Sequence, residues 1–201
     1  MRPAKRAVDV VASLTGSLLL LPLFAVIAVA VRSDGGPVFF RQRRVGRHGR
    51  EFHMWKFRSM VVRAEQTGPQ LTAHGDPRIT RVGRWLRRTK MDELPQLFNV
   101  LAGDMSLVGP RPEVPRYVAL YTPTQRAVLA LTPGITDPAS LHYVDESALL
   151  AEASDPEALY IGTLMPDKIA RNLAYAQQAT LASDVAVIVR TLLAATGVGR
   201  R

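Results

Sequence analysis

The hydrophobic pattern of the chain is dominated by a run of 22 uncharged, mostly apolar residues at positions 10–31. A straight helix of this length rises about 33 Å, which is enough to cross a hydrocarbon core of about 30 Å. Pro22 lies near the middle of the run and predicts a kink, because proline has no amide hydrogen to donate. Ser13, Thr15 and Ser17 precede it and are placed to hydrogen-bond to the strained backbone.

Three interpretations of this run compete. A cleaved signal peptide agrees with the basic start and the Ala28-Val29-Ala30 triplet, but the apolar run is too long and Asp9 lies at its edge. A simple spanning helix has the right length, but basic residues flank both ends, and both ends then prefer the cytoplasmic side. A re-entrant hairpin satisfies both flanks, and the kink supports it. We therefore expect residues 1–32 to form a monotopic anchor on the cytoplasmic face of the plasma (inner) membrane.

Two short strands follow a turn cluster at residues 34–37. Residues 38–40 and 52–57 are rich in aromatic residues and flank a Gly-containing connection, which predicts a β-hairpin. In the second strand, alternation places Phe52, Met54, Lys56 and Arg58 on one face. Two cations at the end of an apolar strand face are able to meet a phosphate, although exposed cations at a strand end are common.

A basic amphipathic helix is predicted after Thr80, which is a suitable N-cap. Its apolar stripe contains Val82, Trp85 and Leu86, and arginines line another side. Such a helix suits a membrane interface, and it equally suits a surface helix that packs Trp85 into a core.

The next predicted helix has Leu94, Leu97, Phe98 and Leu101 on one side and ends at Gly103. Pro95 fits its first turn, and two acidic residues stand at its start. Further helices are expected at residues 166–178 and 185–193, and Pro133-Gly134 marks a loop. No repeats or low-complexity tracts occur. The expected fold is therefore α/β, mostly helical with a short β-hairpin, a re-entrant membrane helix and interfacial amphipathic helices, with residues 33–201 as one compact domain.

The charge distribution narrows the possible partners. The chain has 26 Lys and Arg against 17 Asp and Glu residues, a net charge of +9, and residues 32–90 contain fifteen basic and four acidic residues. A segment this basic indicates nucleic acid, an anionic membrane surface or a phosphorylated substrate, unless it is a solvated face. The absence of cysteine excludes disulfides, a thiolate nucleophile and cysteine-based metal sites.

Adjacent carboxylates at Asp92 and Glu93 follow a cluster of basic residues. Carboxylates bind Mg²⁺ together with substrate phosphates, and a carboxylate can attack phosphorus to form an acyl phosphate. The alternative is that these residues only cap a helix, because Thr89 and Asp92 have the spacing of a capping box. Asp145-Glu146 is a similar pair without a basic cluster, so the pair alone is not specific.

Arg111 lies between Pro110 and Pro112. The two prolines restrict the backbone and thereby the position of the guanidinium, which suits bidentate recognition of a phosphate. An arginine in a rigid surface turn is the alternative.

Several motifs in this order resemble the bacterial sugar transferases of the monotopic phosphoglycosyl transferase family. They extend over almost the whole chain, from a Lys5-Arg6 start and a Pro-broken apolar segment onward. The motifs are GPVFF (36–40), KFRSM (56–60), DELPQLFNV (92–100), GDMSLVGPRP (103–112) and PGIT (133–136).

The resemblance implies an enzyme that transfers a sugar-1-phosphate from a UDP-sugar to a membrane polyprenol phosphate, releases UMP and initiates surface glycan or exopolysaccharide assembly. It also implies that Asp92 is the nucleophile and that Glu93 helps to bind Mg²⁺. We expect the substrate phosphates to contact a set of basic residues and the rigid turn: Lys56, Arg58, Arg87, Pro110, Arg111 and Pro112.

Two other functions remain open from the residues. A membrane-tethered basic module would gather nucleic acid or anionic lipid through the basic segment, with Trp55 and Trp85 as stacking or interface residues. An inactive relative would serve as a partner subunit. Of these, the transferase is the one that we expect, with no nucleic-acid partner; the sequence leaves the sugar, the polyprenol length and a possible homo-oligomer undecided.

Overall fold

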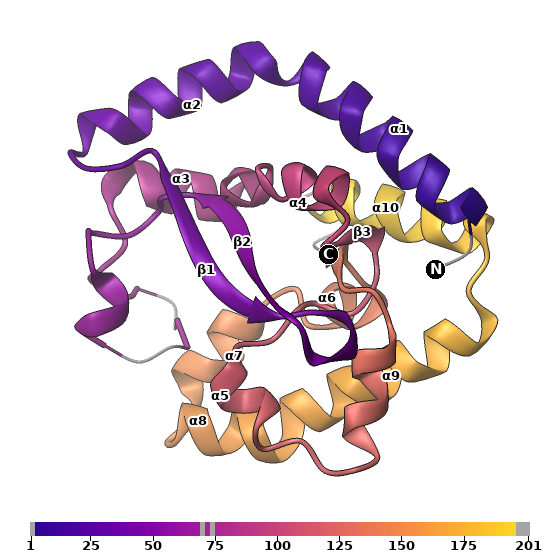
Figure 1. Cartoon of the computed structure of the whole chain (residues 1–201). Helices are drawn as coiled ribbons and strands as arrows, with labels where there is room; N and C mark the ends of the chain where they lie inside the picture. Colours follow the sequence, from indigo (N-terminus) through magenta and orange to yellow (C-terminus); the bar gives the residue numbers. More distant parts are fainter. Residues whose placement is uncertain (1–2, 69–70, 73–74, 196–201) are drawn as a thin grey trace.

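The computed structural model describes residues 3–68, 71–72 and 75–195. Two helices, α1 (Pro3–Leu19) and α2 (Leu21–Ser33), form an arch above the rest of the chain (Figure 1). The next elements are β1 (Phe39–Val45), η1 (Arg47–Gly49), β2 (Glu51–Phe57), η2 (Ala64–Gln66), α3 (Arg81–Arg88), η3 (Met91–Glu93) and α4 (Gln96–Ala102). The remainder consists of β3 (Ser106–Val108), α5 (Pro115–Val118), η4 (Gln125–Ala130), β4 (Gly134–Thr136), α6 (Pro138–His142), α7 (Glu146–Glu152), α8 (Pro156–Leu159), η5 (Tyr160–Leu164), α9 (Met165–Gln178) and α10 (Leu181–Ala195).

The predicted hairpin is confirmed, and β1 and β2 pair antiparallel with Phe39 opposite Phe57. β1 is longer than the aromatic run indicated, because its pairing continues through the arginine-rich residues to Val45. Met54 and Phe57 are both fully buried although they lie on opposite faces. The reason is that the hairpin is covered on both sides. On one side, the ring centroids of Phe57 and of Phe24 in α2 lie 5.4 Å apart. On the other side, Met54 packs with residues of α4 and of the segment after it.

A second pair of strands was not predicted. β3 and β4 are parallel, with Ser106 opposite Gly134 and Val108 opposite Thr136. Each strand has only three residues, which is too short for a period of two to be visible in the sequence. Pro133-Gly134, which we expected to mark a loop, instead leads directly into β4, which begins at Gly134.

The predicted helices are confirmed, but α4 begins at Gln96, so Pro95 and the two acidic residues precede this helix instead of lying in its first turn. Thr80 caps α3 by accepting a hydrogen bond from the amide of Gly83, and Gly103 closes α4 with a φ of 95°. Trp85 is 41% exposed while Leu86 is fully buried, so the interpretation that packs Trp85 into a core is wrong. The two helices expected at the carboxyl end correspond to α9 and α10.

Pro22 lies in the first turn of α2, and α1 and α2 are bent by 62° relative to each other. Among the described residues, no single helix is long and apolar enough to span a membrane, but this bent pair together has the required length and composition. The hydroxyls of Ser13 and Ser17 have no hydrogen-bond partner and are buried, so the expectation that they support the backbone near the kink is wrong. Thr15 is exposed. The face of the pair that points away from the domain carries exposed apolar residues, among them Val11, Leu18, Leu19, Val26 and Val29.

Both ends of the bent pair contact the same domain. At the start of α1, Lys5 donates to Asp184 of α10 at 2.7 Å, and the buried carboxylate of Asp9 accepts from the Ser106 hydroxyl at 2.7 Å. At the end of α2, the buried guanidinium of Arg58 donates to the carbonyl oxygen of Val31 at 2.8 Å. These contacts attach both the beginning and the end of the arch to the part of the chain that follows it.

Gly83 tests the packing of α3 on the segment after the hairpin. A Cβ at this position would lie 1.9 Å from the backbone oxygen of Ser59, so α3 has to move away in a Gly83→Ala variant. We expect the variant to lose about 1–3 kcal/mol of unfolding free energy, which lowers the melting temperature by about 3–10 °C. Gly162→Ala is the matched control, because nothing lies within 4 Å of an added Cβ there. Equal melting temperatures for the two variants in thermal unfolding would contradict this packing.

Candidate active site

All eight predicted site residues line one cavity of about 1050 Å³ between the arch, the hairpin and the helices of the carboxyl-terminal part. The residues come from β2 and the segment after it, α3, η3 and the turn that follows β3. They are Lys56, Arg58, Arg87, Asp92, Glu93, Pro110, Arg111 and Pro112. Tertiary folding thus brings together side chains from four separate stretches of the sequence.

The two adjacent carboxylates lie in a single 3₁₀ turn between α3 and α4. The turn is preceded by Lys90 with a φ of 58°, a left-handed conformation that is uncommon for a side-chain-bearing residue and that is concentrated at functional sites. The Thr89 hydroxyl donates to the carbonyls of Trp85 and Leu86, and Pro95 occupies the position before α4. The capping-box interpretation of Thr89 and Asp92 is therefore wrong.

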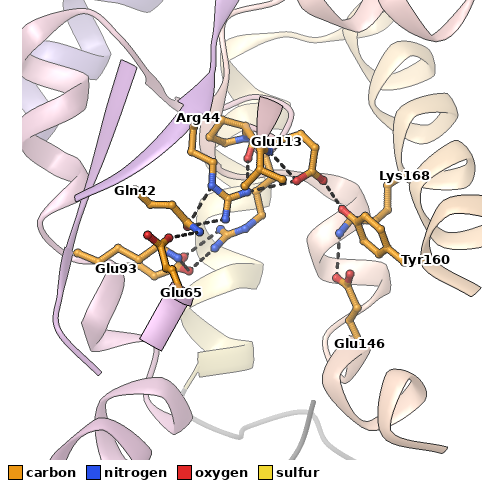
Figure 2. Close-up of polar contacts among 12 residues, drawn as sticks. Gln42, Arg44, Glu65, Glu93, Glu113, Glu146, Tyr160 and Lys168 are labelled. Atoms are coloured by element: carbon orange, nitrogen blue, oxygen red, sulfur yellow. Dashed lines mark hydrogen bonds and ion pairs between the residues drawn. The ribbon is translucent and has the colours of Figure 1, made fainter. Parts of the chain in front are cut away.

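Glu93 is the centre of a charge cluster (Figure 2). The Arg111 guanidinium donates from both terminal nitrogens to the two oxygens of Glu93, one of them at 3.0 Å, and Lys56 Nζ lies 3.4 Å from Oε1. The three side chains are mostly buried, with exposed fractions of 16–26%. A bidentate arginine in such a setting fixes the carboxylate in direction as well as in charge.

Asp92 differs from its neighbour. Its carboxylate is buried and makes no hydrogen bond or ion pair with any residue that the structure describes, although it lines the cavity. A buried carboxylate without a partner costs free energy, so its retention in a cavity is a signal of function.

The electrostatics separate the two carboxylates. Burial raises the pKa of Asp92, and the charge of Glu93 raises it further, against the opposing effect of Lys56 and Arg87. Burial alone would raise the pKa of Glu93 as well, but Arg111 and Lys56 outweigh it and hold this pKa well below the ordinary value. Burial lowers the pKa of Lys56 to about 8, although Glu93 opposes the shift. Neighbouring groups with divergent pKa values are typical of active sites.

The remaining predicted cations have different surroundings. Arg87 of α3 lines the cavity and lies close enough to Asp92 to lower its pKa. Arg58 also lines the cavity, but its guanidinium donates to the backbone oxygens of Pro37 and Val31 at 2.8 Å each. Arg58 is thus engaged in holding the end of α2, and the structure does not bring it into the cluster around Glu93.

Pro110 and Pro112 frame Arg111 as the sequence indicated. The backbone oxygen of Pro110 accepts from the amide of Gly134 at 3.0 Å, which ties the turn to β4. The backbone oxygen of Pro112 accepts from the Arg44 guanidinium at 2.9 Å, which ties it to β1. The turn is thereby held at both ends.

Sequence reasoning missed two groups of residues that support the site. Asn99 of α4 accepts from the amide of Trp55 at 2.9 Å and donates to the oxygen of His53 at 2.8 Å, so it binds α4 to the free edge of β2. Arg44 and Glu113 form a polar chain that continues to Tyr160 (Figure 2). The sequence signal for Asn99 is a single amide side chain within the otherwise apolar residues 97–102. No local feature of the sequence distinguishes Arg44 from the neighbouring arginines.

The donor set of the cavity suits a divalent cation that shares its ligands with a substrate. Asp92 and Glu93 are adjacent, and the Asp92 oxygens have no hydrogen-bond or ion-pair partner among the described residues. Within the described residues there is no group of three or more acidic or histidine side chains that would hold a metal by itself. Mg²⁺ commonly takes one or two carboxylates and completes its shell with substrate phosphates and water, so these residues fit it.

The chain is similar to known proteins over almost its whole length. Residues 1–197 match the family model described as bacterial sugar transferase. A UDP-N-acetylgalactosamine-undecaprenyl-phosphate N-acetylgalactosaminephosphotransferase of Aeromonas hydrophila is 38% identical over 98% of this chain and 45% of its own length. A UDP-glucose:undecaprenyl-phosphate glucose-1-phosphate transferase of Xanthomonas campestris pv. campestris is 39% identical over 96% of this chain and 39% of its own. For a protein of the same name in Caulobacter vibrioides, the identity is 37% over 94% of this chain and 68% of its own.

The share of each relative's length that the chain covers differs between the matches. The chain spans less than half of the length of the Aeromonas and Xanthomonas relatives, and in three further matches it spans 31–66% of the curated relative. The family model, by contrast, is matched along nearly the entire chain, including the bent helix pair and every motif of the cavity. The chain therefore belongs to the bacterial sugar transferase family.

Proposed function

We propose that this chain is a phosphoglycosyl transferase, which moves a sugar-1-phosphate from a UDP-sugar to a polyprenol phosphate in the membrane and releases UMP. The product would initiate the assembly of a surface glycan. The observation that carries the proposal is the unpaired buried carboxylate of Asp92 in a cavity lined by Lys56, Arg87 and Arg111. The names of the relatives, which act on undecaprenyl phosphate, support the same reaction class.

In the first step, a carboxylate oxygen of Asp92 attacks the phosphorus that carries the sugar. The bond from this phosphorus to the bridging oxygen of the diphosphate breaks, and UMP leaves with that oxygen and the bonding electron pair. The enzyme then carries an acyl phosphate between Asp92 and the phosphosugar. The carboxylate attacks in its ionised form, which the positive charges of Lys56 and Arg87 favour against the effect of burial.

The main obstacle to this step is the electrostatic repulsion between a carboxylate and a diphosphate, and the cations of the cavity reduce it. Arg111 offers a planar fork for phosphate oxygens, and Lys56 and Arg87 add positive charge beside Asp92. Glu93 holds Arg111 and Lys56 in the cavity while no donor is bound. Mg²⁺, held by Asp92 and Glu93 together with the donor phosphates, would neutralise further charge on the diphosphate.

In the second step, a phosphate oxygen of the polyprenol phosphate attacks the same phosphorus. The bond between that phosphorus and Asp92 breaks, the carboxylate is restored, and a polyprenyl-diphosphate-linked sugar is formed. This acceptor lies in a membrane while the donor is soluble in water. The reaction therefore requires a site at the membrane surface.

The bent helix pair supports a re-entrant anchor at residues 1–32. Lys5 and Asp9 at its start and Val31 at its end contact the same catalytic domain, which follows from 33 onward. A helix that crossed the bilayer would separate its two ends by the full hydrocarbon thickness. A pair whose ends both return to one domain enters the membrane and leaves it on the same side. We place that side at the cytoplasm, where UDP-sugars are available.

The alternative of a basic module that binds nucleic acid or anionic lipid gains nothing from the comparisons. It also leaves the arrangement of Asp92, Glu93 and Arg111 without a purpose. Its affinity for a polyanion would fall with salt and would survive Asp92→Ala, so the variants below distinguish it.

Replacement of the nucleophile tests the first step. Asp92→Asn keeps the shape of the side chain but removes its negative charge, so we expect UMP release to fall by at least about a thousandfold. The assay supplies a panel of UDP-sugars, Mg²⁺ and undecaprenyl phosphate to the full chain. With donor alone, mass spectrometry of the wild type should detect a phosphosugar adduct on the intact protein and, after digestion, on the peptide that contains Asp92.

Asp145→Asn is the matched control, because Asp145 begins the other Asp-Glu pair of the chain and is exposed. We expect it to retain activity within about twofold. Turnover that survives in Asp92→Asn would overturn the covalent mechanism.

The titration of Lys56 predicts the alkaline side of the pH profile. Its pKa of about 8 means that the ammonium is charged below this pH and neutral above it. We therefore expect the KM for the UDP-sugar to rise as the pH increases from 7 to 9.5, since one positive charge near the phosphates is lost. In Lys56→Arg the cation persists throughout this range, so the rise should disappear. The same alkaline rise in both proteins would rule out Lys56 as its source.

The absence of cysteine allows a direct test of the anchor. Single cysteines at Ala4 and Ser33, which are both exposed, mark the two flanks of the bent pair. A membrane-impermeant maleimide should label neither position in intact cells and both positions in inverted membrane vesicles. The unmodified chain serves as the blank. Labelling of one flank in intact cells would show that the segment crosses the membrane.

A further inference from the structure

Arg44 is an arginine of the cavity wall whose guanidinium is held by other groups of the protein. It lies near the end of β1, and its side chain is 14% exposed. Nε and Nη2 donate to the Gln42 side-chain oxygen at 3.1 and 2.7 Å, and Nη1 donates to the Pro112 backbone oxygen at 2.9 Å and to Glu113 at 3.4 Å. Because every nitrogen of the guanidinium already has an acceptor, Arg44 differs from an arginine that is free to receive a substrate.

The Pro112 oxygen belongs to the turn that carries Arg111. The other end of this turn is tied to β4 through the oxygen of Pro110. On the Arg44 side, the turn is tied to β1 through Arg44 and through the amide of Val45, which donates to the Glu113 backbone oxygen at 2.8 Å. The backbone of Arg111 therefore sits between two supports, and Arg44 supplies the only side chain among the described residues that donates to the Pro112 oxygen.

Glu113 extends this support to the carboxyl-terminal helices. Its carboxylate accepts from Arg44, from the amide of Val114 at 2.7 Å and from the hydroxyl of Tyr160 (Figure 2). Tyr160 begins η5, a π-helical turn, and such turns occur often at functional sites. The series of hydrogen bonds from Arg44 through Glu113 to Tyr160 thus connects the hairpin, the turn that carries Arg111 and the π-helical turn that precedes α9.

We propose that Arg44 is a positioning residue for the transfer reaction, which sets the direction of Arg111 toward Glu93 and the donor phosphates by holding the Pro112 carbonyl and the Glu113 carboxylate. The inference rests on the proposed function, since it assumes that Arg111 contacts a diphosphate. Arg44 itself does not contact the donor. A lysine cannot replace it, because a single ammonium cannot reach Gln42, Pro112 and Glu113 in the directions that the planar fork provides.

A double-mutant cycle tests this inference in the full chain. If Arg44 acts only through Arg111, Arg44→Gln lowers kcat/KM for the UDP-sugar by about 10- to 100-fold, as a small misplacement of a phosphate-binding group does. The same substitution in an Arg111→Gln background then costs no more than about twofold, because the residue it positions is already gone. Arg44→Lys should give the same coupling as Arg44→Gln. Effects that multiply in the double variant would overturn the inference.

Two further measurements separate positioning from loss of structure. Arg43→Gln is the matched control. Arg43 directly precedes Arg44 in β1, so its side chain lies on the opposite face of the strand, and it is 64% exposed. It should leave kcat/KM within about twofold. Tyr160→Phe removes only the hydroxyl from Glu113 and should lower kcat/KM in the same direction as Arg44→Gln, with the same loss of effect when Arg111 is absent. If Arg44→Gln does not fold, the cycle is measured with Arg44→Lys and Tyr160→Phe.

The cycle is repeated on the dissociation constant of UDP, which requires no turnover. A wild type that binds UDP but never releases UMP would refute the proposed function, and the coupling between Arg44 and Arg111 in UDP affinity would still decide the positioning role. A coupling found in both readouts supports the inference. Independent effects of the two arginines on UDP affinity would contradict it.

Discussion

The pairing of Glu93 with Arg111 and Lys56 inside a largely buried cavity is the interaction on which the site depends. Three mostly buried charges are tolerated only because each has a close partner, and removal of one leaves the others uncompensated. The partners come from β2, from η3 and from the turn after β3, so the pairing holds these three parts of the chain in register. Of the two adjacent carboxylates, Asp92 is the one that has no hydrogen bond or ion pair among the described residues, and burial raises its pKa.

The surroundings of this cluster serve to keep it in place. Asn99 fastens α4 to the edge of β2, which sets the distance between η3 and Lys56. The Pro110 and Pro112 carbonyls fasten the Arg111 turn to β4 and to β1. Such support is typical of sites in which a charged group has to meet a phosphate in one defined position, because precision of placement contributes directly to rate.

The proposed anchor and the proposed transfer reaction both require the same location at a membrane surface. A donor that is soluble in water and an acceptor held in lipid meet only at an interface, and a helix pair bent by 62° with both ends on one domain suits that location. The pair is attached by polar contacts of Lys5, Asp9 and Arg58 and by a buried apolar cluster of Phe24, Ile27, Val31, Phe57 and Leu86. The apolar face that remains exposed on α1 and α2 is the surface that a bilayer would cover.

Several features followed from the sequence because they are local. The Pro22 kink, the hairpin, the Thr80 cap and the Gly103 helix end each depend on residues a few positions apart, and local backbone chemistry determines them. The motifs also indicated the family and the eight residues that line the cavity. The β3–β4 pair, the bonds of Asn99 and the chain from Arg44 to Tyr160 join residues that are distant in sequence. Only tertiary structure decides such contacts, because a buried polar side chain takes its partner from whichever element packs against it, and neither periodicity nor turn chemistry encodes that choice.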